Sequence, residues 1–234
     1  MENNRHNIQL VLLRHGQSVW NRDKVFTGWS DVELSPKGRE EAAQAGQLLK
    51  DSGFHFDLCF TSMLKRAIQT QQIATQAMEL DDLPIQRDWR LNERHYGALE
   101  GIPHWDAIAQ FGLWPILMSQ VKFTAPPPAL DATDPRFPGN QDRYSAINPG
   151  ELPLTESMEH THARIQPYWH DTIVPEIKAG KRILIVSHNN ILRTLMMHLD
   201  NLTQTQVMKL SLATAKPVVY ELDSKLKAIR HYNL

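Results

Sequence analysis

Two histidines each follow a short apolar run that is typical of a buried strand. His15 comes after Ile8–Leu13 with only Arg14 between them, and His188 comes directly after Arg182–Ser187. Ligands of open parallel sheets bind at the carboxyl ends of the strands, so we expect both imidazoles to face one site. Imidazole can act as a nucleophile and as a proton carrier near neutral pH. Two such residues together favour a catalytic site over two structural histidines.

Two arginines accompany the histidines. Arg14 precedes His15, and Arg66 falls in the first turn of a helix expected after the run Leu58–Thr61. A guanidinium presents a planar fork of donors that matches phosphate oxygens, and backbone amides at helix starts add partial positive charge. These groups could hold one dianionic phosphoryl group against His15. We therefore predict phosphoryl transfer through a covalent phosphohistidine at His15.

Such a reaction needs a proton donor for the leaving oxygen, and Glu93 is the candidate. It lies in the segment Leu91–Gly97 (LNERHYG). A carboxylate beside phosphate oxygens is disfavoured by like-charge repulsion, so this carboxyl could hold a proton near neutral pH. The alternative for Glu93 is an ordinary surface ion pair with its neighbour Arg94.

Alternating strands and helices must position these residues. Strands are predicted over 8–13, 58–61, 182–187 and 217–222, and helices over 35–51, 62–78 and 191–199. Ser35 and Ser62 are the expected N-caps, and Gly53 is the expected stop of the first helix. This rhythm predicts an α/β fold, a three-layer sandwich whose mostly parallel central sheet is flanked by helices. We expect one domain over residues 1–234.

A proline-rich stretch at about 125–153 interrupts the alternation of strands and helices. Seven of the fourteen prolines lie between Pro126 and Pro153, together with Phe137, Tyr144 and Ile147. An unstructured tether would not need these large apolar side chains. The stretch is predicted to be an irregular insertion, and it could be either a cover of the site or a merely ordered excursion.

Composition narrows the classes of partner. The net charge is −1, so no strong field gathers nucleic acid or anionic lipid. No apolar run is long enough for a membrane span, and the start Met1–Asn7 is polar, which predicts a cytoplasmic protein.

The single cysteine, Cys59, is expected in the core. His160 and His162 lack further ligands at metal spacing, so no metal site is predicted.

Five stretches of sequence carry a resemblance to a known family: LLRHGQS ending at Ser18, Trp20-Asn21, FTGW at 26–29, TSMLKRA at 61–67, and 91–97. These resemble the cofactor-dependent phosphoglycerate mutases of the histidine phosphatase superfamily. The likeness runs from about Ile8 to Tyr232 and includes PGELPLTES at 149–157. The triplet Arg-His-Gly at 14–16 is typical of the whole superfamily, whereas the stretch around Glu93 and FTGW point to the mutase branch.

The resemblance implies roles for these residues. His15 would be the phosphorylated nucleophile and Glu93 the general acid and base, while Arg14, Arg66 and His188 would stabilise the transferring group. The substrate-binding residues would be Arg14, Ser18, Asn21, Thr27, Gly28, Arg66, Glu93, Arg94, Tyr96 and Asn190. The family interconverts 3-phosphoglycerate and 2-phosphoglycerate, is primed by 2,3-bisphosphoglycerate and needs no metal. Its members are often dimeric or tetrameric, which leaves a homo-oligomer open.

The sequence departs from the family where the second anionic group of the substrate should bind. His104 stands where the family has a lysine, and Gln120 and Val121 stand where it has two arginines; Lys122 is the nearest cation. Two lost charged hydrogen-bond partners would weaken binding by about 3–6 kcal/mol. A second hypothesis is therefore a phosphatase of the same superfamily that acts on a less anionic, partly apolar phosphomonoester. A third, a non-catalytic binding protein, is disfavoured because the groups that handle the phosphoryl group are all present.

Overall fold

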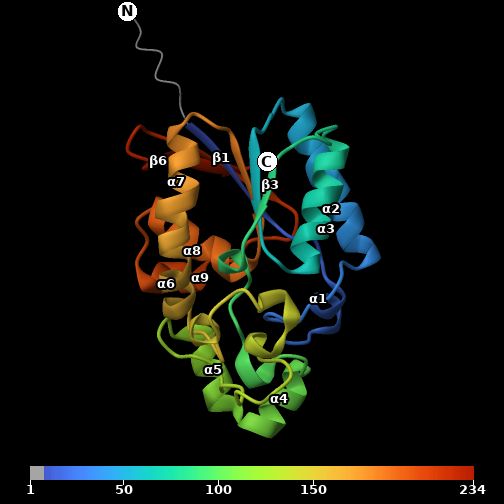
Figure 1. The fold of residues 1–234 in the computed structure, drawn as a ribbon, viewed down its shortest axis with the longest axis vertical. Coiled ribbons are helices and arrows are strands. Elements are labelled where there is room, and N and C mark those ends of the chain that lie inside the picture. Colours follow the sequence, from blue (N-terminus) through green and yellow to red (C-terminus); the bar gives the residue numbers. More distant parts are fainter. Residues whose placement is uncertain (1–7) are drawn as a thin grey trace, which may run out of the picture.

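A six-stranded sheet forms the centre of this computed structural model, which describes residues 8–234 (Figure 1). The strands are β1 (Ile8–Arg14), β2 (Leu58–Thr61), β3 (Ile85–Arg87), β4 (Ile183–Ser187), β5 (Pro217–Leu222) and β6 (Ala228–Asn233). Their order across the sheet is β3-β2-β4-β1-β5-β6. The first four are mutually parallel, whereas β5 pairs antiparallel with β1 and β6 antiparallel with β5. The predicted mostly parallel sheet is confirmed.

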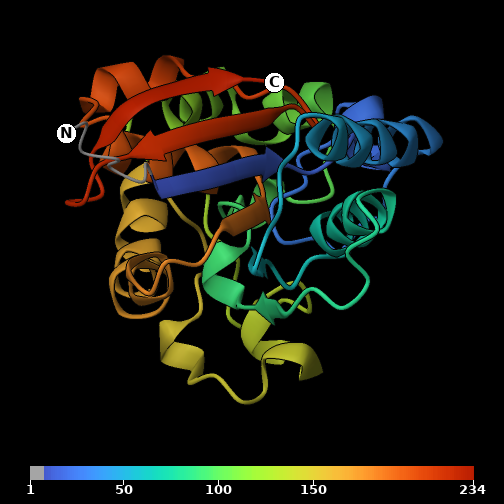
Figure 2. The same ribbon diagram turned by 90° about the horizontal axis from the view of Figure 1, so that it is seen from above.

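Helices cover both faces of this sheet (Figure 2). They are α1 (Val19–Asp23), α2 (Pro36–Asp51), α3 (Lys65–Ala77), α4 (His104–Phe111), α5 (Leu113–Val121), α6 (Met158–Tyr168), α7 (Val174–Lys178), α8 (Asn189–Leu199) and α9 (Gln204–Lys209). Leu10 and Leu12 of β1 pack in a core with α6, α7 and α8. Val11 and Leu13 point the other way, into a second core with α2 and α3. A strand buried on both faces needs such a continuous apolar run, and the three-layer sandwich is confirmed.

The predicted helix over 35–51 agrees closely with α2. The hydroxyl oxygen of Ser35 accepts a hydrogen bond from the amide of Gly38, and Pro36 occupies the first helical position. The helix ends at Asp51, and Gly53 has a φ of +77°, a left-handed conformation that suits glycine. Local capping chemistry therefore fixed both ends of this helix.

The prediction that Ser62 caps α3 is wrong. The helix begins at Lys65 with Leu64 as its N-cap, and no side chain caps it. The Ser62 hydroxyl instead lies 2.8 Å from Nε2 of His188. Two strands, β3 and β6, were not predicted. β3 has only three residues, and β6 is mostly exposed, so neither shows an apolar run.

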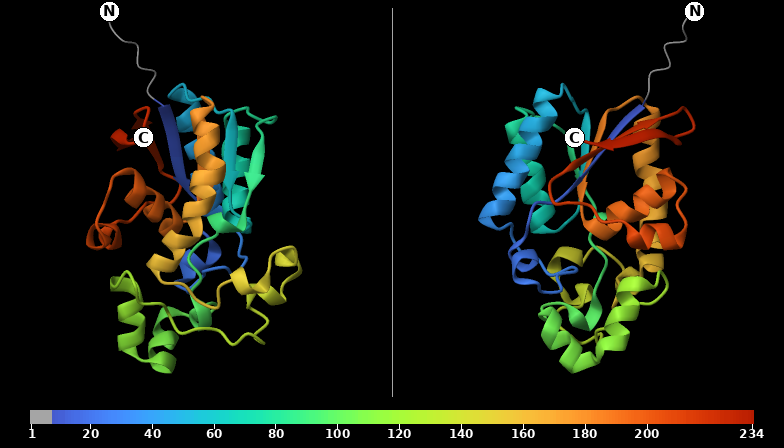
Figure 3. Two further views of the ribbon diagram at one scale, coloured as in Figure 1. Left: turned by 60° about the vertical axis from the view of Figure 1, so that its left-hand side comes forward. Right: turned by 180° about the vertical axis from the view of Figure 1, so that it is seen from behind.

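The proline-rich stretch 125–153 lies below the sheet, beside α4 and α5 (Figure 3). Within it, helical structure is limited to short 3-10 turns at Pro138–Asn140, Asp142–Tyr144 and Pro149–Glu151. Phe137 and Tyr144 are buried in a small core with Trp29 and Trp89. The stretch is irregular and its large apolar side chains are buried, while the organisation as one domain with an insertion stays a prediction.

The sequence predicts no membrane span and a buried Cys59. Within residues 8–234, none of the helices combines the length and the apolar character that crossing a membrane requires. The polar start at Met1–Asn7 lies outside the described residues. Cys59 is fully buried, as predicted, and burial raises the pKa of its thiol.

Candidate active site

His15 follows β1 directly, and its proton is placed by one hydrogen bond. Its side chain is 3% exposed, and Nδ1 lies 2.7 Å from the carbonyl oxygen of Gly16. A carbonyl only accepts, so Nδ1 must donate, and Nε2 keeps its lone pair. Burial lowers the pKa of His15 well below its usual value, and the charges of Arg66 and Arg14 lower it further. The imidazole is therefore neutral at pH 7, with a nucleophilic Nε2.

His188 lies beside His15 because the strands that precede them are in register. Arg14 at the end of β1 pairs with Ser187 at the end of β4, and the two imidazole centroids lie 5.0 Å apart. Burial lowers the pKa of His188 well below its usual value, and the charge of Arg66 adds to this effect. Its Nε2 contacts the Ser62 hydroxyl, and its Nδ1 has no hydrogen-bond partner among the described residues.

Arg66 projects from the first turn of α3 into the same region. Its guanidinium is almost fully buried and donates to the carbonyl oxygens of Gly28 at 2.6 Å and Ser30 at 3.0 Å. Gly28 has a φ of +51°, and a Cβ atom there would lie 1.9 Å from a carboxylate oxygen of Glu100. Only glycine therefore lets this loop turn so that its carbonyls face Arg66.

Arg14 and Arg66 lack carboxylate partners within residues 8–234. Arg14 donates to the carbonyl oxygen of Leu212, and its buried Nε has no hydrogen-bond partner. Burial lowers the pKa of both guanidiniums. Arg66 is buried and Arg14 partly buried, and removing such charges from water without an ion-pair partner costs free energy that an anion bound between them would relieve.

Glu93 faces these cations from the loop after β3. Its side chain is 7% exposed, and its Oε1 accepts from the backbone amides of Arg94 at 2.8 Å and Asn190 at 3.1 Å. The Arg94 guanidinium points elsewhere and donates to the carbonyl oxygen of Ser119. The alternative of a surface ion pair between Glu93 and Arg94 is therefore wrong.

Arg164 on α6 holds the backbone that carries Glu93. Its guanidinium donates to the carbonyl oxygens of Arg90, Glu93 and two other residues of the 89–93 segment. It also forms a buried ion pair with Glu156 at 2.6 Å. The indole N–H of Trp29 donates to the same Glu93 carbonyl. Several donors converge on a short irregular segment, which fixes the position of the carboxylate.

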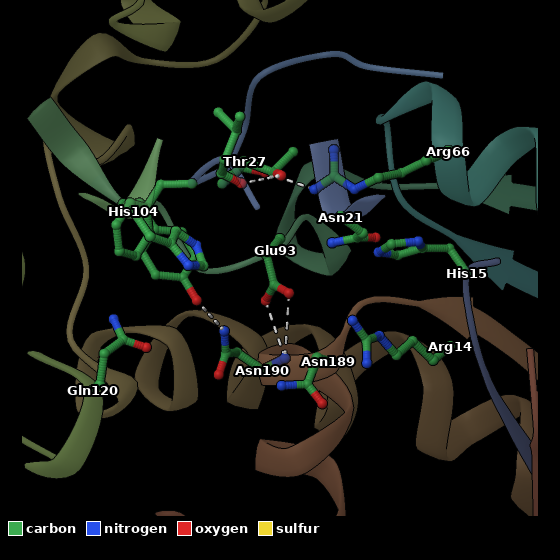
Figure 4. Close-up of a pocket in the computed structure, with 14 residues that line it drawn as sticks. Arg14, His15, Asn21, Thr27, Arg66, Glu93, His104, Gln120, Asn189 and Asn190 are labelled. Atoms are coloured by element: carbon green, nitrogen blue, oxygen red, sulfur yellow. Dashed lines mark hydrogen bonds between the residues drawn. The ribbon is translucent and has the colours of Figure 1, made fainter. Parts of the chain in front are cut away.

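These side chains line one cavity of about 200 Å³ (Figure 4). His15, Arg14 and Arg66 lie at one end, Glu93 lies in the middle, and His104 and Gln120 lie at the opposite end. The lining residues are Arg14, His15, Asn21, Val25, Phe26, Thr27, Gly28, Arg66, Glu93, Tyr96, His104, Gln120, Asn189 and Asn190. A small anion with one phosphate against His15 fits a cavity of this shape and charge.

Comparison with known proteins agrees with this arrangement. The family model described as histidine phosphatase superfamily (branch 1) matches residues 10–234. The chain belongs to the histidine phosphatase superfamily. It is 55% identical over 227 residues to 2,3-bisphosphoglycerate-dependent phosphoglycerate mutase 1 of Nitrosomonas europaea, covering 97% of each chain.

Solved structures share the superfamily fold. The α-ribazole phosphatase of Shigella flexneri matches with a TM-score of 0.73 and 21% identity, covering 97% of this chain and 96% of its own. A mycobacterial glucosyl-3-phosphoglycerate phosphatase complexed with VO3 matches with a TM-score of 0.69 and 24% identity, covering 96% of each chain. At these identities the likeness concerns the fold.

Most predicted site residues of this superfamily member come together. Nine of them line the cavity: Arg14, His15, Asn21, Thr27, Gly28, Arg66, Glu93, Tyr96 and Asn190. Three are not among the lining residues. His188 is fully buried beside His15, and Ser18 is fully buried as the N-cap of α1, where its hydroxyl accepts from the amide of Asn21. Arg94 is buried with its guanidinium 4.6 Å from the Tyr96 ring centroid, so it supports that wall from behind.

Three contributors to this site are not predicted by the sequence pattern. Ser62 has the residue type of a helix cap, but its hydroxyl contacts His188. Arg164 gave no local signal, because its partners lie about 70 residues earlier in the chain. Asn189 lines the cavity from the start of α8, directly after His188. A polar residue next to a strand-end histidine is the signal that could have identified Asn189.

Two of the three residues that depart from the mutase pattern, His104 and Gln120, line the cavity. His104 and Gln120 line the far end of the cavity, whereas Val121 and Lys122 do not. The His104 ring packs against Phe26 in a tilted arrangement, with centroids 4.3 Å apart. Burial and the nearby charge of Lys24 lower the pKa of His104. The far end of the cavity therefore has no permanently charged cation among its lining residues.

Proposed function

We propose that this chain interconverts 3-phosphoglycerate and 2-phosphoglycerate through a phosphohistidine at His15, primed by 2,3-bisphosphoglycerate. One observation carries the proposal: a neutral His15 with a free Nε2 shares a cavity with the buried Arg66 and the partly buried Arg14, neither of which has an ion-pair partner within residues 8–234. The Nitrosomonas europaea relative, at 55% identity, is named for this activity.

In the proposed reaction, Nε2 of His15 attacks the phosphorus atom of a phosphomonoester. The bond between phosphorus and the ester oxygen breaks, and Glu93 gives its proton to that oxygen. Arg14, Arg66 and the imidazole of His188 surround the transferring group and stabilise its charge. In the return step, Glu93 removes a proton from the free hydroxyl of 3-phosphoglycerate, whose oxygen takes the phosphoryl group from His15 and forms 2,3-bisphosphoglycerate. Attack of His15 Nε2 on the other phosphorus, with Glu93 returning the proton to the ester oxygen, then releases 2-phosphoglycerate and phosphorylates His15 again.

The residues present fit the bisphosphate primer at its reacting end. Arg14 and Arg66 offer donors to a phosphate, and the partnerless Arg14 Nε and His188 Nδ1 are buried polar atoms that an anion could satisfy. 2,3-Bisphosphoglycerate would supply the first phosphoryl group to His15. Asn21, Thr27, Tyr96 and Asn190, with the backbone of Gly28, are the proposed contacts to the rest of the substrate.

The first prediction concerns isomerisation. The purified protein is incubated with 3-phosphoglycerate, with and without 2,3-bisphosphoglycerate, and 2-phosphoglycerate and free phosphate are followed together. We expect 2-phosphoglycerate to form and its rate to depend on the bisphosphate. Release of phosphate from other esters without isomerisation would contradict the mutase and favour the phosphatase.

Two substitutions separate the proposed roles. His15→Ala should abolish covalent labelling by the bisphosphate, because it removes Nε2, the nucleophile of the proposed reaction. Glu93→Gln should lower kcat by about 10²–10⁴-fold, the usual contribution of a general acid, while inorganic phosphate still binds. Labelling of the His15→Ala protein would rule out His15 as the phosphoryl carrier.

The remaining expectations from the sequence stay predictions. They are a cytoplasmic location, no nucleic-acid partner and the open question of a homo-oligomer. Sedimentation of the purified protein over a concentration series would measure the oligomeric state.

A further inference from the structure

The charge of the candidate active site is concentrated at one end of the cavity. Arg14 and Arg66 lie at the His15 end, and the far end presents the Gln120 amide and the His104 ring (Figure 4). A second anionic group at the far end therefore meets no permanent cation among the lining residues there, although the charge of Lys24 acts on His104. On a longer molecule, such a group could reach the cations that lie beyond Gln120.

A second cavity begins at Gln120. This groove of about 560 Å³ lies between the end of α5 and α9. It is lined by Gln120, Val121, Lys122, Phe123, Gln204, Thr205, Met208 and Lys209. Because Gln120 lines both cavities, a molecule bound at His15 could extend across this side chain into the groove.

Two lysines from different elements face this groove. Lys122 directly follows α5, and Lys209 is the last residue of α9. Neither forms an ion pair within residues 8–234, and the residues that line the groove include no carboxylate. The groove thus holds two uncompensated cations, which is the charge complement of an acidic group.

The rest of the groove surface suits a carbon skeleton. Phe123 is buried and packs with Met158 and Val207, and Met208 lies against the same cluster. Val121 is 48% exposed beside them. Methionine and valine side chains offer apolar contact without demanding hydrogen bonds from a ligand.

We propose that this groove is a binding site for the distal acidic group of a phosphomonoester longer than phosphoglycerate. The phosphate lies against His15, the carbon chain crosses Gln120, and the far carboxylate or phosphate binds Lys122 and Lys209. This proposal rests on the phosphohistidine chemistry proposed above. His15 Nε2 takes the phosphoryl group as Glu93 protonates the ester oxygen; water then attacks phosphorus, Glu93 accepts its proton, and phosphate and free His15 are restored.

Binding can be measured apart from turnover. The His15→Ala protein is titrated calorimetrically with 6-phosphogluconate, which has a carboxylate at the end opposite its phosphate, and with glucose 6-phosphate, which has none. We expect 6-phosphogluconate to bind about 10–100-fold more tightly, as two charged contacts allow. Lys122→Ala with Lys209→Ala in the same background should bring the two Kd values within about twofold.

A matched control removes two lysines elsewhere. Lys178→Ala with Lys225→Ala takes the same charge from exposed positions that line neither cavity, and the preference should persist. Equal Kd values for the two esters, or a preference that survives loss of Lys122 and Lys209, would overturn the groove proposal. The isomerisation assay on the unmodified protein is independent, so failure of the groove and failure of the mutase proposal are distinguishable.

Discussion

At the scale of single residues, the position of one proton decides what His15 can do. Its Nδ1 is committed to the Gly16 carbonyl oxygen, so the lone pair on Nε2 remains available in the cavity. Burial and two guanidiniums keep the ring neutral, whereas a protonated imidazole would have no lone pair to attack phosphorus. The same arginines that lower the pKa of His15 would bind the phosphate it attacks. The two guanidiniums would thus keep the His15 imidazole neutral and also bind the phosphate that it attacks.

The second prediction concerns Arg164, which we infer to be a positioning residue for Glu93. Arg164→Lys keeps the charge beside Glu156 but loses the planar fork that reaches several carbonyl oxygens at once. We expect kcat to fall by about 10–100-fold with KM changed less than threefold, because small misplacement of a catalytic group is costly. Steady-state isomerisation kinetics give this split.

A control separates positioning from general destabilisation. Arg182→Lys alters an exposed ion pair with Asp57 and should leave kcat within twofold. If Arg164→Lys lowers the thermal midpoint but leaves kcat unchanged at a temperature where the protein is folded, Arg164 is only structural.

At the scale of elements, the strands and helices that have a local sequence pattern could be predicted. Continuous apolar runs identified β1, β2, β4 and β5, and the strand ends brought His15 and His188 together as expected. β6 escaped because it borders the sheet with mostly exposed side chains and shows no apolar run. The start of α3 was misplaced because Ser62, a good N-cap by type, bonds a histidine 126 residues away. The lack of an apolar run therefore explains the unpredicted edge strand, and a contact between distant segments explains the misplaced helix start.

The proline-rich stretch 125–153 supports the site from outside. None of its residues lines the cavity, so its contribution in this structure is contact rather than cover. The Tyr144 hydroxyl accepts from the side-chain amide of Asn92, whose oxygen accepts from the backbone of Met63. Asn92 adjoins Glu93, and this chain of contacts joins the irregular stretch to the catalytic loop.

The third prediction tests this link. Tyr144→Phe removes the acceptor of a buried amide and should lower the free energy of unfolding by about 1–3 kcal/mol. Urea denaturation measures the change. Tyr232→Phe is the matched control, because within the described residues its hydroxyl makes no hydrogen bond, and it should cost less than about 0.5 kcal/mol. Equal effects of the two substitutions would contradict a role for the Tyr144 hydroxyl.

At the scale of the whole molecule, the site concentrates positive charge that the chain as a whole does not have. The net charge is −1, yet two buried histidines and Arg14 meet at the carboxyl ends of β1 and β4, and the buried Arg66 joins them from α3. The fold keeps these groups together because large apolar cores lie on both sides of the sheet. The apolar cores therefore supply the stability that keeps these arginines and histidines together, although their proximity is unfavourable without a bound anion.

The fourth prediction is the pH dependence that this arrangement imposes on stability. His15 and His188 have folded-state pKa values well below the ordinary value near 6.5, mainly because of burial. Below pH 6.5 the unfolded chain takes up these protons while the folded chain does not, so stability falls as pH falls. The slope approaches about 1.4 kcal/mol per pH unit for each histidine once the pH lies well below 6.5. Urea unfolding at pH 7.5, 6.5 and 5.5 should show a loss of about 2 kcal/mol over the last unit, about 1 kcal/mol for each histidine.

The source of this loss can be isolated. Asp57, whose pKa is lowered to about 2 by hydrogen bonds from Arg182, contributes stability that is lost only as pH falls below about 4, outside this window. His15→Asn with His188→Asn removes both buried titrating rings and should flatten the profile between pH 6.5 and 5.5 by most of the predicted amount. Should the double variant be too unstable to measure, His15→Asn alone should remove about half of the slope. A profile as steep in these variants as in the unmodified protein would assign the pH dependence to other groups.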